Sequence, residues 1–288
     1  MKIILFSRKG IALRTEDIDE IFGAIERYGF DYAINRAFAE NIEEHTSRII
    51  PTEFIYDGEV GEQPADSVMV CYGGDGTLLE GVHRLGGADI PVVGINGGHL
   101  GFLALAPREN IKEVFEGIAS KNLNLEQRDM LCVEGLDNGH LYALNEVAVQ
   151  RLGAAMISVE AVIDDNMVAT YNGDGVIIST PTGSTAYSLS AGGAIIDTSI
   201  DCMLLTPVCP HSFNNSRSIV FSSKSVLQIK DVQNGESNTY LTADGRINEQ
   251  LEFSDVVEIR ASEKTINLIK LKNEKFYSRV YQKIAERK

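Results

Sequence analysis

The sequence predicts two domains: an α/β domain with an open, mostly parallel sheet and flanking helices, followed by a β-rich domain. Up to about residue 122, short continuous apolar runs alternate with segments of helical periodicity. Strands that alternate with helices in this way are typical of a doubly wound parallel sheet. Beyond that residue, short strand-like stretches separated by turn residues dominate. The length of 288 residues suits one large domain or two of ordinary size.

In the first domain, 1–122, continuous apolar runs predict strands buried on both faces: Lys2–Phe6, Ser67–Cys71 and Pro91–Ile95. Apolar residues at helical spacing predict two helices, one carrying Ile18, Ile21, Phe22 and Ile25, the other Ile111, Val114, Phe115 and Ile118. We expect Thr15 to cap the first of these helices, with Glu16 and Asp17 in its first turn.

In the second domain, 123–271, the triplets Asp137-Asn138-Gly139 and Asp164-Asp165-Asn166 predict turns, the first of them a hairpin. A glycine-rich segment, 182–194, is expected to form a short helix among the strands. The tail, 272–288, has helical spacing over Phe276–Glu286 and is expected to pack back on the first domain. The further strands expected here are Met167–Tyr171, Val176–Ser179, Ser218–Phe221, Val226–Lys230, Val256–Arg260 and Ile266–Leu271.

Composition and charge favour a globular protein of a reducing compartment. Hydrophobic residues make up 44% and charged residues 23%. No basic patch accompanies the formal net charge of −15, which argues against a nucleic-acid partner. No apolar run reaches the roughly 20 residues of a membrane span. The four cysteines have no metal-ligand or CxxC spacing, so we expect a cytoplasmic protein whose chain supplies no metal site of its own: Cys71, Cys132, Cys202 and Cys209.

The first segment suited to chemistry is the loop Tyr72–Glu80, which follows the second predicted strand. Three glycines in four residues let the backbone approach a ligand closely. We expect Thr77 to cap the next helix, so that its positive end faces a phosphate. Asp75 repels phosphate but can bind Mg²⁺ or accept a proton from an attacking hydroxyl. A tight turn with a solvent-facing Asp75 is the alternative.

Two further segments are weaker on their own. Gly94–Gly101 follows the next predicted strand, where neighbouring loops of a parallel sheet line a ligand crevice, but taken alone the segment favours a flexible connection. His99 in this segment has no nearby histidine at ligand spacing. Asn145-Glu146 interrupts the apolar run Leu141–Val149 and indicates either a polar site or an exposed strand edge. In a site, Asn145 can pair with a base and Glu146 can accept bonds from ribose hydroxyls.

The densest polar segment runs from Thr180 to Gly193, shortly after Gly173-Asp174-Gly175. Its hydroxyls and glycines are poor core material, but they supply many short donors and acceptors together with Tyr187, whose ring can stack on a base or sugar. A Ser/Thr-rich surface loop is the alternative. No GxSxG elbow is present, which argues against a serine hydrolase. Thr242–Arg246 by itself predicts only a turn.

In this order and spacing the segments resemble the NAD kinase family. The GGDGT loop alone also occurs in lipid kinases and phosphofructokinases, but its combination with the Asn-Glu pair and the TPTGSTAYSLSAGG run is specific. The resemblance covers most of the chain from about residue 66 to 250. It rests on Gly73–Thr77, Asn145-Glu146, Gly173–Gly175, Thr182–Gly193 and Asp244-Gly245.

The resemblance implies an α/β domain and a β-rich domain with NAD in the cleft. It implies that Asp75 is the general base or Mg²⁺ partner for the 2′-hydroxyl of the adenosine ribose. Asn145 and Glu146 would hold the adenosine. Asp174 would contact the nicotinamide end from a neighbouring subunit, because family members form dimers or tetramers. At Arg246 many relatives have glutamine.

The implied cofactors and partners are ATP with Mg²⁺ or another divalent cation, NAD as substrate, and a second copy of the chain in a homodimer or homotetramer; neither a nucleic acid nor a membrane is expected. Asp75 is the implied catalytic residue. The residues implied to bind NAD or ATP are Gly73, Gly74, Gly76, Thr77, Asn145, Glu146, Asn172, Asp174, Thr182, Thr185, Ala186, Tyr187, Ser188, Leu189, Ser190 and Arg246.

Two other functions stay open from the sequence. A diacylglycerol- or sphingosine-type lipid kinase fits Gly73–Glu80, but it gives the segment 180–193 no role. A non-catalytic NAD or nucleotide sensor would keep the pocket, although the intact Asp75 argues against it. A hydride-transferring dehydrogenase is disfavoured because no GxGxxG follows a strand.

Overall fold

The chain forms two compact units in the computed structural model, which describes residues 1–97, 101–104, 106–136, 139–211, 217–232, 239–271 and 276–286. Unit 1 comprises Met1–Gln127 and Ile266–Lys288, and unit 2 comprises Arg128–Thr265. Both divisions of the chain fall inside strands, in β7 (Asn124–Glu134) and in β18 (Val256–Lys270). Because the residue pattern does not change within a strand, the sequence alone cannot locate these unit boundaries to a single residue. The predicted class, an α/β domain plus a β-rich domain, is confirmed.

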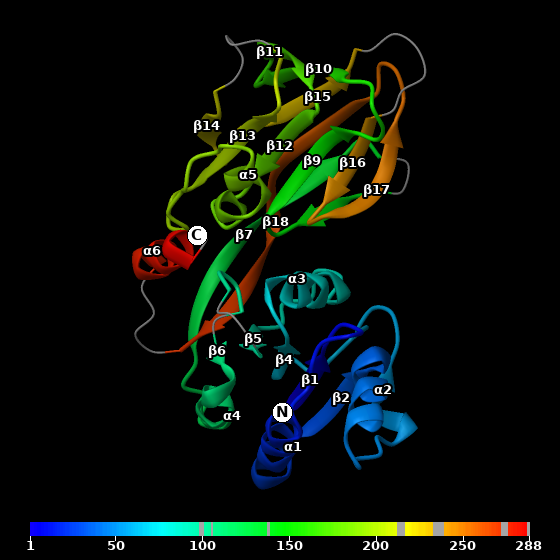
Figure 1. Cartoon of the computed structure of the whole chain (residues 1–288), viewed down its shortest axis with the longest axis vertical. Helices are drawn as coiled ribbons and strands as arrows, with labels where there is room; N and C mark the ends of the chain where they lie inside the picture. Colours follow the sequence, from blue (N-terminus) through cyan, green and yellow to red (C-terminus); the bar gives the residue numbers. More distant parts are fainter. Residues whose placement is uncertain are drawn as a thin grey trace. The chain divides into compact units, whose positions relative to one another are not determined.

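Unit 1 is built on a parallel sheet with the order β3-β2-β1-β4-β5 (Figure 1). The strands are β1 (Lys2–Phe6), β2 (Asp31–Asn35), β3 (Ile55–Tyr56), β4 (Ser67–Tyr72) and β5 (Val92–Asn96), with the short β6 (Ala106–Pro107) beside β5. The three predicted strands are confirmed as β1, β4 and β5. Every residue of β4 and β5 is buried, as a strand covered on both faces requires.

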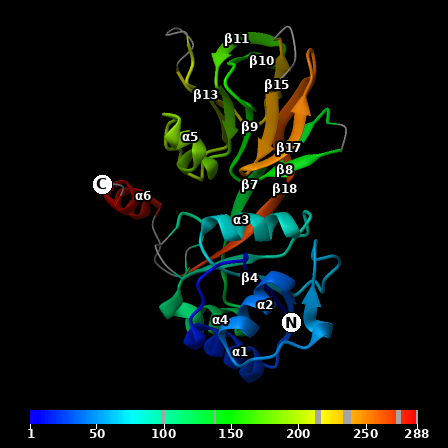
Figure 2. The ribbon, with the colours of Figure 1, turned by 45° about the vertical axis from the view of Figure 1, so that its right-hand side comes forward.

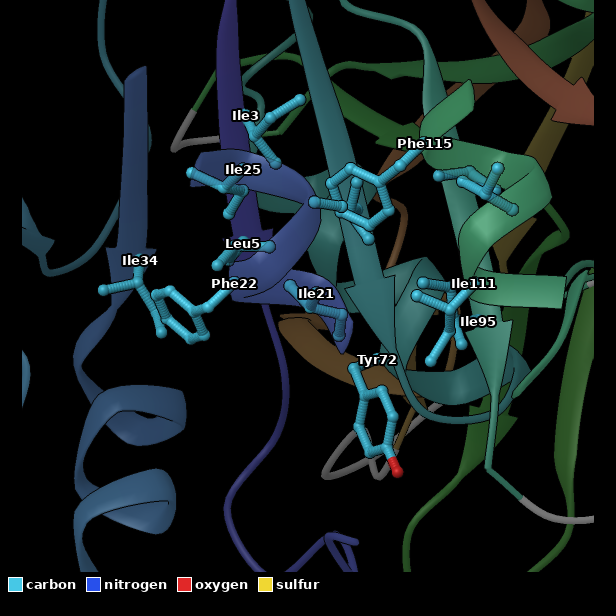
Figure 3. Close-up of a cluster of buried hydrophobic side chains, with 14 of the residues drawn as sticks. Ile3, Leu5, Ile21, Phe22, Ile25, Ile34, Tyr72, Ile95, Ile111 and Phe115 are labelled. Carbon is cyan, nitrogen blue, oxygen red and sulfur yellow. The ribbon is translucent and has the colours of Figure 1, made fainter. Parts of the chain in front are cut away.

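Alternate side chains of a strand point to opposite faces of the sheet, so the continuous apolar runs make both faces apolar. Helices cover both of these faces. The helices of unit 1 are α1 (Thr15–Tyr28), α2 (Arg36–His45), α3 (Asp75–Arg84), α4 (Ile111–Ala119) and α6 (Phe276–Glu286), with single turns at Thr52–Phe54 and Arg108–Asn110. The predicted apolar stripes of α1 and α4 belong to one buried cluster with Ile3 and Leu5 of β1 and Ile95 of β5 (Figure 3). Helix α3 packs on the other face, where Gly81 lies against Cys71 and Met69.

The predicted cap of the first helix is wrong. Helix α1 begins at Thr15 itself, its N-cap is Arg14, and no side chain caps it. Thr15 has instead entered the first turn together with Glu16 and Asp17, whose negative charges suit the positive helix end. Asp17 is also buried, and it accepts a hydrogen bond from the Tyr72 hydroxyl at 2.6 Å.

Unit 2 is built mainly of β-strands (Figure 2). They pair antiparallel and surround one apolar core. One sheet has the order β14-β13-β12-β9-β16-β17. In other pairings, β10, β11, β15 and β18 form a second antiparallel group, and β7 pairs with β8. The remaining bounds are β8 (Leu141–Ala143), β9 (Glu146–Arg151), β10 (Ile157–Ile163), β11 (Asn166–Gly173), β12 (Gly175–Ser179), β13 (Cys202–Val208), β14 (Ile219–Ser222), β15 (Leu227–Asp231), β16 (Thr239–Ala243) and β17 (Arg246–Leu251).

Most predictions for the second half hold, with two corrections. The two predicted strands Val256–Arg260 and Ile266–Leu271 merge into one strand, β18, which ends at Lys270, and the run Leu141–Val149 divides into β8 and β9. The turn at Asp164 and Asp165 is confirmed, since both residues have a left-handed backbone. The 182–194 segment contains a single turn, Gly183–Thr185, and the short helix α5 (Tyr187–Ser190). Asp137 and Asn138 lie outside the described residues.

No helix of the described part of the chain is long and apolar enough to cross a bilayer.

Candidate active-site residues

The GGDG loop forms the junction between β4 and α3 in unit 1. Gly73 has a φ of +148°, and a Cβ placed there would lie 2.4 Å from Thr77 Oγ1, so only glycine fits. Gly74 is the N-cap and Asp75 is the first helical residue. The predicted cap by Thr77 is wrong, because Thr77 lies buried inside the first turn and no side chain caps α3. The positive helix end still lies at the loop, as an anion site requires.

The Asp75 carboxylate is bound by three consecutive backbone N–H groups. Oδ2 accepts a bond from Phe102 at 2.8 Å, and Oδ1 accepts bonds from Leu103 and Ala104 at 2.9 Å each. A Cβ on Gly101 would lie 1.8 Å from Oδ1, so this approach requires glycine. Asp75 is therefore not a free turn residue. Because Oδ2 accepts only one of the three bonds, it retains a lone pair for a hydroxyl proton.

The segment Gly94–Gly101 contributes packing as well as this contact. A Cβ on Gly94 would lie 2.6 Å from Ala104 Cα, which explains a glycine inside a buried strand. Gly98, His99 and Leu100 lie outside the described residues. The segment that binds Asp75 through its N–H groups also accepts a hydrogen bond: Arg279 of α6 donates to the Phe102 carbonyl at 2.9 Å. The C-terminal helix thus contacts the loop that Asp75 holds.

A second feature of unit 1 involves residues that were not among the predicted site residues. A cavity of about 290 Å³ lies at the end of β1 and is lined by Ser7, Arg8, Lys9, Arg36, Glu80 and Arg84 among others. Arg8 reaches the GGDG loop, since its Nη1 would lie 3.0 Å from a Cβ on Gly76. Glu80 pairs with Arg8 at 3.4 Å and with Arg84 at 3.2 Å. The excess of cationic groups suits an anionic ligand.

In unit 2 the Asn145-Glu146 pair lies at the break between β8 and β9, and it is not an exposed strand edge. The exposed fractions of Asn145 and Glu146 are only 6% and 7%. The Asp244 carboxylate accepts hydrogen bonds from the N–H groups of Leu144 at 2.9 Å, Asn145 at 2.8 Å and Glu146 at 3.2 Å. From the opposite side, Thr180 donates its hydroxyl to the Leu144 carbonyl at 2.7 Å and its N–H to the Asn145 carbonyl at 2.9 Å.

Glu146 is electrostatically perturbed. Burial, and then the neighbouring negative charge of Asp244, raise the pKa of Glu146 to about 7, against a bond from the Tyr187 N–H that lowers it. Its Oε2 is buried without a hydrogen-bond partner among the described residues. A buried acceptor of this kind is costly unless a ligand hydroxyl occupies it. Burial also raises the pKa of Asp244, although three N–H groups and Arg246, the first residue of β17, oppose the shift.

The Thr180–Gly193 segment divides into hydroxyls that hold the fold and side chains that face outward. Thr182 accepts a bond from Arg128 at 3.2 Å, Thr185 donates to the Thr182 carbonyl at 3.2 Å, and Ser188 pairs with Thr206 at 2.9 Å. A Cβ on Gly183 would lie 1.9 Å from the Asn145 oxygen. The remaining predicted residues of the segment, Ala186, Tyr187, Leu189 and Ser190, are partly or fully exposed. Nucleotide contact by any of these residues stays a prediction.

Asp174 lies in the link between β11 and β12, close to the other predicted residues of unit 2. The Arg151 Nε donates to its Oδ1 at 2.6 Å and lowers the pKa of Asp174. Asn172 uses its carbonyl to accept the His211 N–H at 2.8 Å. Burial raises the pKa of Tyr187, and the charges of Cys209, Asp174 and Glu146 add to the shift, so these groups are neighbours. Arg151 and Cys209 carry no sequence signal beyond their residue types.

The structure therefore gathers Asn145, Glu146, Asp174 and Tyr187 in unit 2, and it places Asp75 with the glycine loop in unit 1. Among the described residues, one group of three brings metal-ligating atoms within 4.8 Å of one another: Cys132, Glu134 and His140. Glu134 is already paired with Arg260, so we assign no metal to this group.

Comparisons with known proteins agree over both units. Residues 41–122 match the family model of the ATP-NAD kinase N-terminal domain, and residues 144–271 match that of the ATP-NAD kinase C-terminal domain. The NAD kinase of Methanothermobacter thermautotrophicus is 34% identical over 97% of this chain and 96% of its own. That of Ruminiclostridium cellulolyticum is 34% identical over 86% and 91%.

Solved structures show the same resemblance. The crystal structure of yeast NADH kinase complexed with NADH has a TM-score of 0.85 and 27% identity, covering 99% of this chain and 87% of the yeast chain. The crystal structure of an NAD kinase from Archaeoglobus fulgidus in complex with ATP has a TM-score of 0.74 over 99% of both chains. At 24% identity, this second likeness concerns the fold.

Proposed function

The chain belongs to the NAD kinase family, and on that premise we propose how its residues phosphorylate the adenosine ribose 2′-hydroxyl of NAD with ATP. The reaction converts NAD and ATP into NADP and ADP, so the chain is a phosphotransferase with an alcohol group as acceptor. Neither a lipid kinase nor a non-catalytic sensor finds support among its relatives.

Asp75 is the general base of this reaction. Its Oδ2 takes the proton of the 2′-hydroxyl, the ribose oxygen forms a bond to the γ-phosphorus, and ADP leaves with the electrons of the broken P–O bond. One observation supports this role above the others. Three N–H groups hold the carboxylate in place, and one lone pair of Oδ2 remains available. Positioning of this kind supplies much of the rate enhancement in phosphoryl transfer.

The glycine loop and α3 bind the phosphates of the nucleotide. Gly73, Gly74, Gly76 and the N-terminus of α3 provide close backbone approach and a positive helix end. A divalent cation bound with ATP would neutralise charge on the phosphates. Mg²⁺ usually takes substrate phosphates and water besides one or two protein carboxylates. Because the remaining lone pair of Asp75 Oδ2 is assigned to the hydroxyl proton, such an ion would be held mainly by the phosphates of ATP and by water.

Unit 2 binds the nucleoside. Asn145 supplies a paired donor and acceptor for the adenine, and Glu146 accepts bonds from ribose hydroxyls. The buried, unpaired Oε2 of Glu146 supports this role. Tyr187 is 40% exposed beside Glu146 and Asp174, so its ring is available for stacking on a base or sugar.

Three further features belong to this proposal. The chain assembles as a homodimer or homotetramer, in which Asp174 contacts the nicotinamide end of NAD held by a neighbouring subunit. The Asp174 side chain is partly exposed beside its ion pair with Arg151, so part of the carboxylate is accessible for such a contact. The protein acts in the cytoplasm, in keeping with its four free cysteines.

An assay specific for NADP tests the reaction and the role of Asp75 together. Purified protein receives NAD, ATP and Mg²⁺, and Asp75→Asn serves as the matched variant. NADP formed by the wild type and not by the variant supports both assignments. Absence of NADP with every nucleoside triphosphate or polyphosphate donor, while NAD still binds, contradicts the kinase function.

A further inference from the structure

The turn that contains Asp244 joins β16 to β17, next to the Asn145-Glu146 segment. Asp244 and Gly245 both have a left-handed backbone, with φ of 47° and 76°. This conformation is favourable for Asp and Gly in a tight hairpin turn. It brings the Asp244 carboxylate to residues that lie 98 to 100 positions earlier in the chain. The Asp244 N–H also donates to the Glu146 carbonyl at 3.0 Å.

The Asn145-Glu146 segment needs such a partner because it lies where the strand pairing ends. The pairing of β9 with β16 runs from Arg151 to Val147, which is opposite Ala243. The N–H groups of Leu144, Asn145 and Glu146 lie beyond that last pair. Unbound and partly buried, they would each cost free energy comparable to a lost hydrogen bond. The Asp244 carboxylate binds all three, while Thr180 binds the carbonyls of Leu144 and Asn145.

We propose that Asp244 is a positioning residue for substrate: its carboxylate fixes the backbone of Leu144–Glu146, and thereby the orientation of the Asn145 and Glu146 side chains that bind NAD. The inference rests on the proposed nucleoside-binding role of those two residues. Asp244 acts through them and does not itself touch the nucleotide. Since both side chains are almost fully buried, a small backbone movement displaces their polar atoms from the ligand.

The charge arrangement is consistent with a dedicated role. A second carboxyl group beside Glu146 is unfavourable for folding, because it adds to the burial that already disfavours the charged form of Glu146. A neutral Ser or Asn in the turn would avoid this repulsion, but neither can accept three N–H bonds on two oxygens. The carboxylate is the side chain that meets the requirement.

The test compares Asp244→Asn with Asp164→Asn, a matched control in the same unit. Asp164 also has a φ of 47° in a hairpin turn, and its Oδ1 accepts a bond from the Val226 N–H at 3.0 Å. Asparagine keeps the size of both side chains, but it presents an NH₂ group to one of the N–H donors around Asp244. We expect Asp244→Asn to raise the KM and the Kd for NAD about tenfold, which is ~1.4 kcal/mol, with a smaller change in kcat and in the KM for ATP.

Asp164→Asn is expected to leave all four constants within about twofold of the wild type. An unchanged NAD affinity in Asp244→Asn overturns the inference, and so does an equal loss of NAD and ATP affinity. If the wild type forms no NADP, the proposed function fails; if it forms NADP and Asp244→Asn behaves like the wild type, only the positioning role fails.

A second variant keeps the test decisive should Asp244→Asn not fold. Thr180→Val removes the hydroxyl that binds the Leu144 carbonyl at 2.7 Å, at similar side-chain volume, and Thr180→Ser restores it. If the fixed backbone of this segment orients Asn145 and Glu146, Thr180→Val raises the KM for NAD severalfold and Thr180→Ser returns it towards the wild-type value. Equal NAD affinity in both variants overturns the inference.

Discussion

The GGDG loop of unit 1 and the Asp244 turn of unit 2 use the same arrangement of hydrogen bonds. In each, one aspartate carboxylate accepts bonds from three consecutive backbone N–H groups, two on Oδ1 and one on Oδ2. Their surroundings differ. Asp75 begins a helix, whose dipole favours a negative charge, whereas Asp244 lies beside the second carboxyl group of Glu146. An identical number of hydrogen bonds therefore does not define the role of a carboxylate; the neighbouring charges do.

The largest effect is expected at Asp75. Asp75→Asn should lower kcat by about two orders of magnitude or more, because the amide cannot take the proton of the 2′-hydroxyl. NAD binding should persist, since the nucleoside-binding residues lie in unit 2. Steady-state rates of NADP formation and a binding titration with NAD measure the two quantities. Turnover of Asp75→Asn near that of the wild type would contradict the catalytic role that distinguishes Asp75 from Asp244.

The next effect concerns the carboxyl pair of unit 2. The pKa of Glu146 in the folded state, about 7, lies above its ordinary value of 4.5. The folded state therefore binds more protons between these values, and the free energy of unfolding falls as the pH rises from about 4.5 to about 7. A shift of this size corresponds to about 3 kcal/mol. Urea unfolding at pH 5 and pH 8 measures it.

Glu146→Gln is the matched variant for that measurement, because glutamine is nearly isosteric and does not titrate. We expect it to lose much of the decrease in stability between pH 5 and pH 8. The same pH dependence in the variant and the wild type would show that Glu146 is not the group responsible.

A third comparison uses two glycines, Gly183 next to the Asn145 backbone and Gly101 next to the Asp75 carboxylate. A Cβ at Gly183 would meet the backbone oxygen of Asn145 at 1.9 Å, whereas a Cβ at Gly101 would meet the Asp75 side chain at 1.8 Å. The Asn145 oxygen belongs to the backbone, so no side-chain rotation can relieve its clash with a new Cβ. Gly183→Ala should therefore lower the free energy of unfolding by about 1–3 kcal/mol. Gly101→Ala should cost less stability but displace Asp75 and lower kcat. Thermal unfolding and turnover of both variants measure the difference.

Gly23→Ala on α1 is the control for the glycine substitutions. No atom lies within 4 Å of a Cβ at that position, and alanine is favoured over glycine in a helix by about 1 kcal/mol. A similar loss of stability in all three alanine variants would contradict the steric explanation.

The smallest effect is expected at the ion pair of Arg151 with Asp174. Both side chains are partly exposed, at 28% and 34%, and such pairs contribute about 0.2–1 kcal/mol. Arg151→Gln should lower stability within that range at neutral pH. Since Arg151 lowers the pKa of Asp174, its contribution is present above the ordinary pKa of an aspartate and disappears as the pH falls. Thermal unfolding at neutral and acidic pH checks it, and a loss above 2 kcal/mol would contradict it.

Much of the fold followed from local pattern. Strands β1, β4 and β5 were predictable because each is a continuous apolar run, and helices α1 and α4 because their apolar residues recur at helical spacing. Helix starts were less predictable, because Thr15 and Thr77 have the residue type of a cap but lie one and three positions inside their helices. Strand breaks depended on partners distant in sequence, as the division of Leu141–Val149 shows.

By itself the sequence determined the two kinds of domain, the glycine loop with Asp75 and the polar segments of the family motif. These are local properties, carried by residue type and by spacing of a few positions. Tertiary structure alone decided that Asp244, which predicts only a turn, binds the backbone of Leu144–Glu146. It also decided that Asp75 is held by the N–H groups of residues 102–104. The physical reason is that every residue type except proline has a backbone N–H, so the path of the chain, and not its composition, determines which of these donors bind a carboxylate.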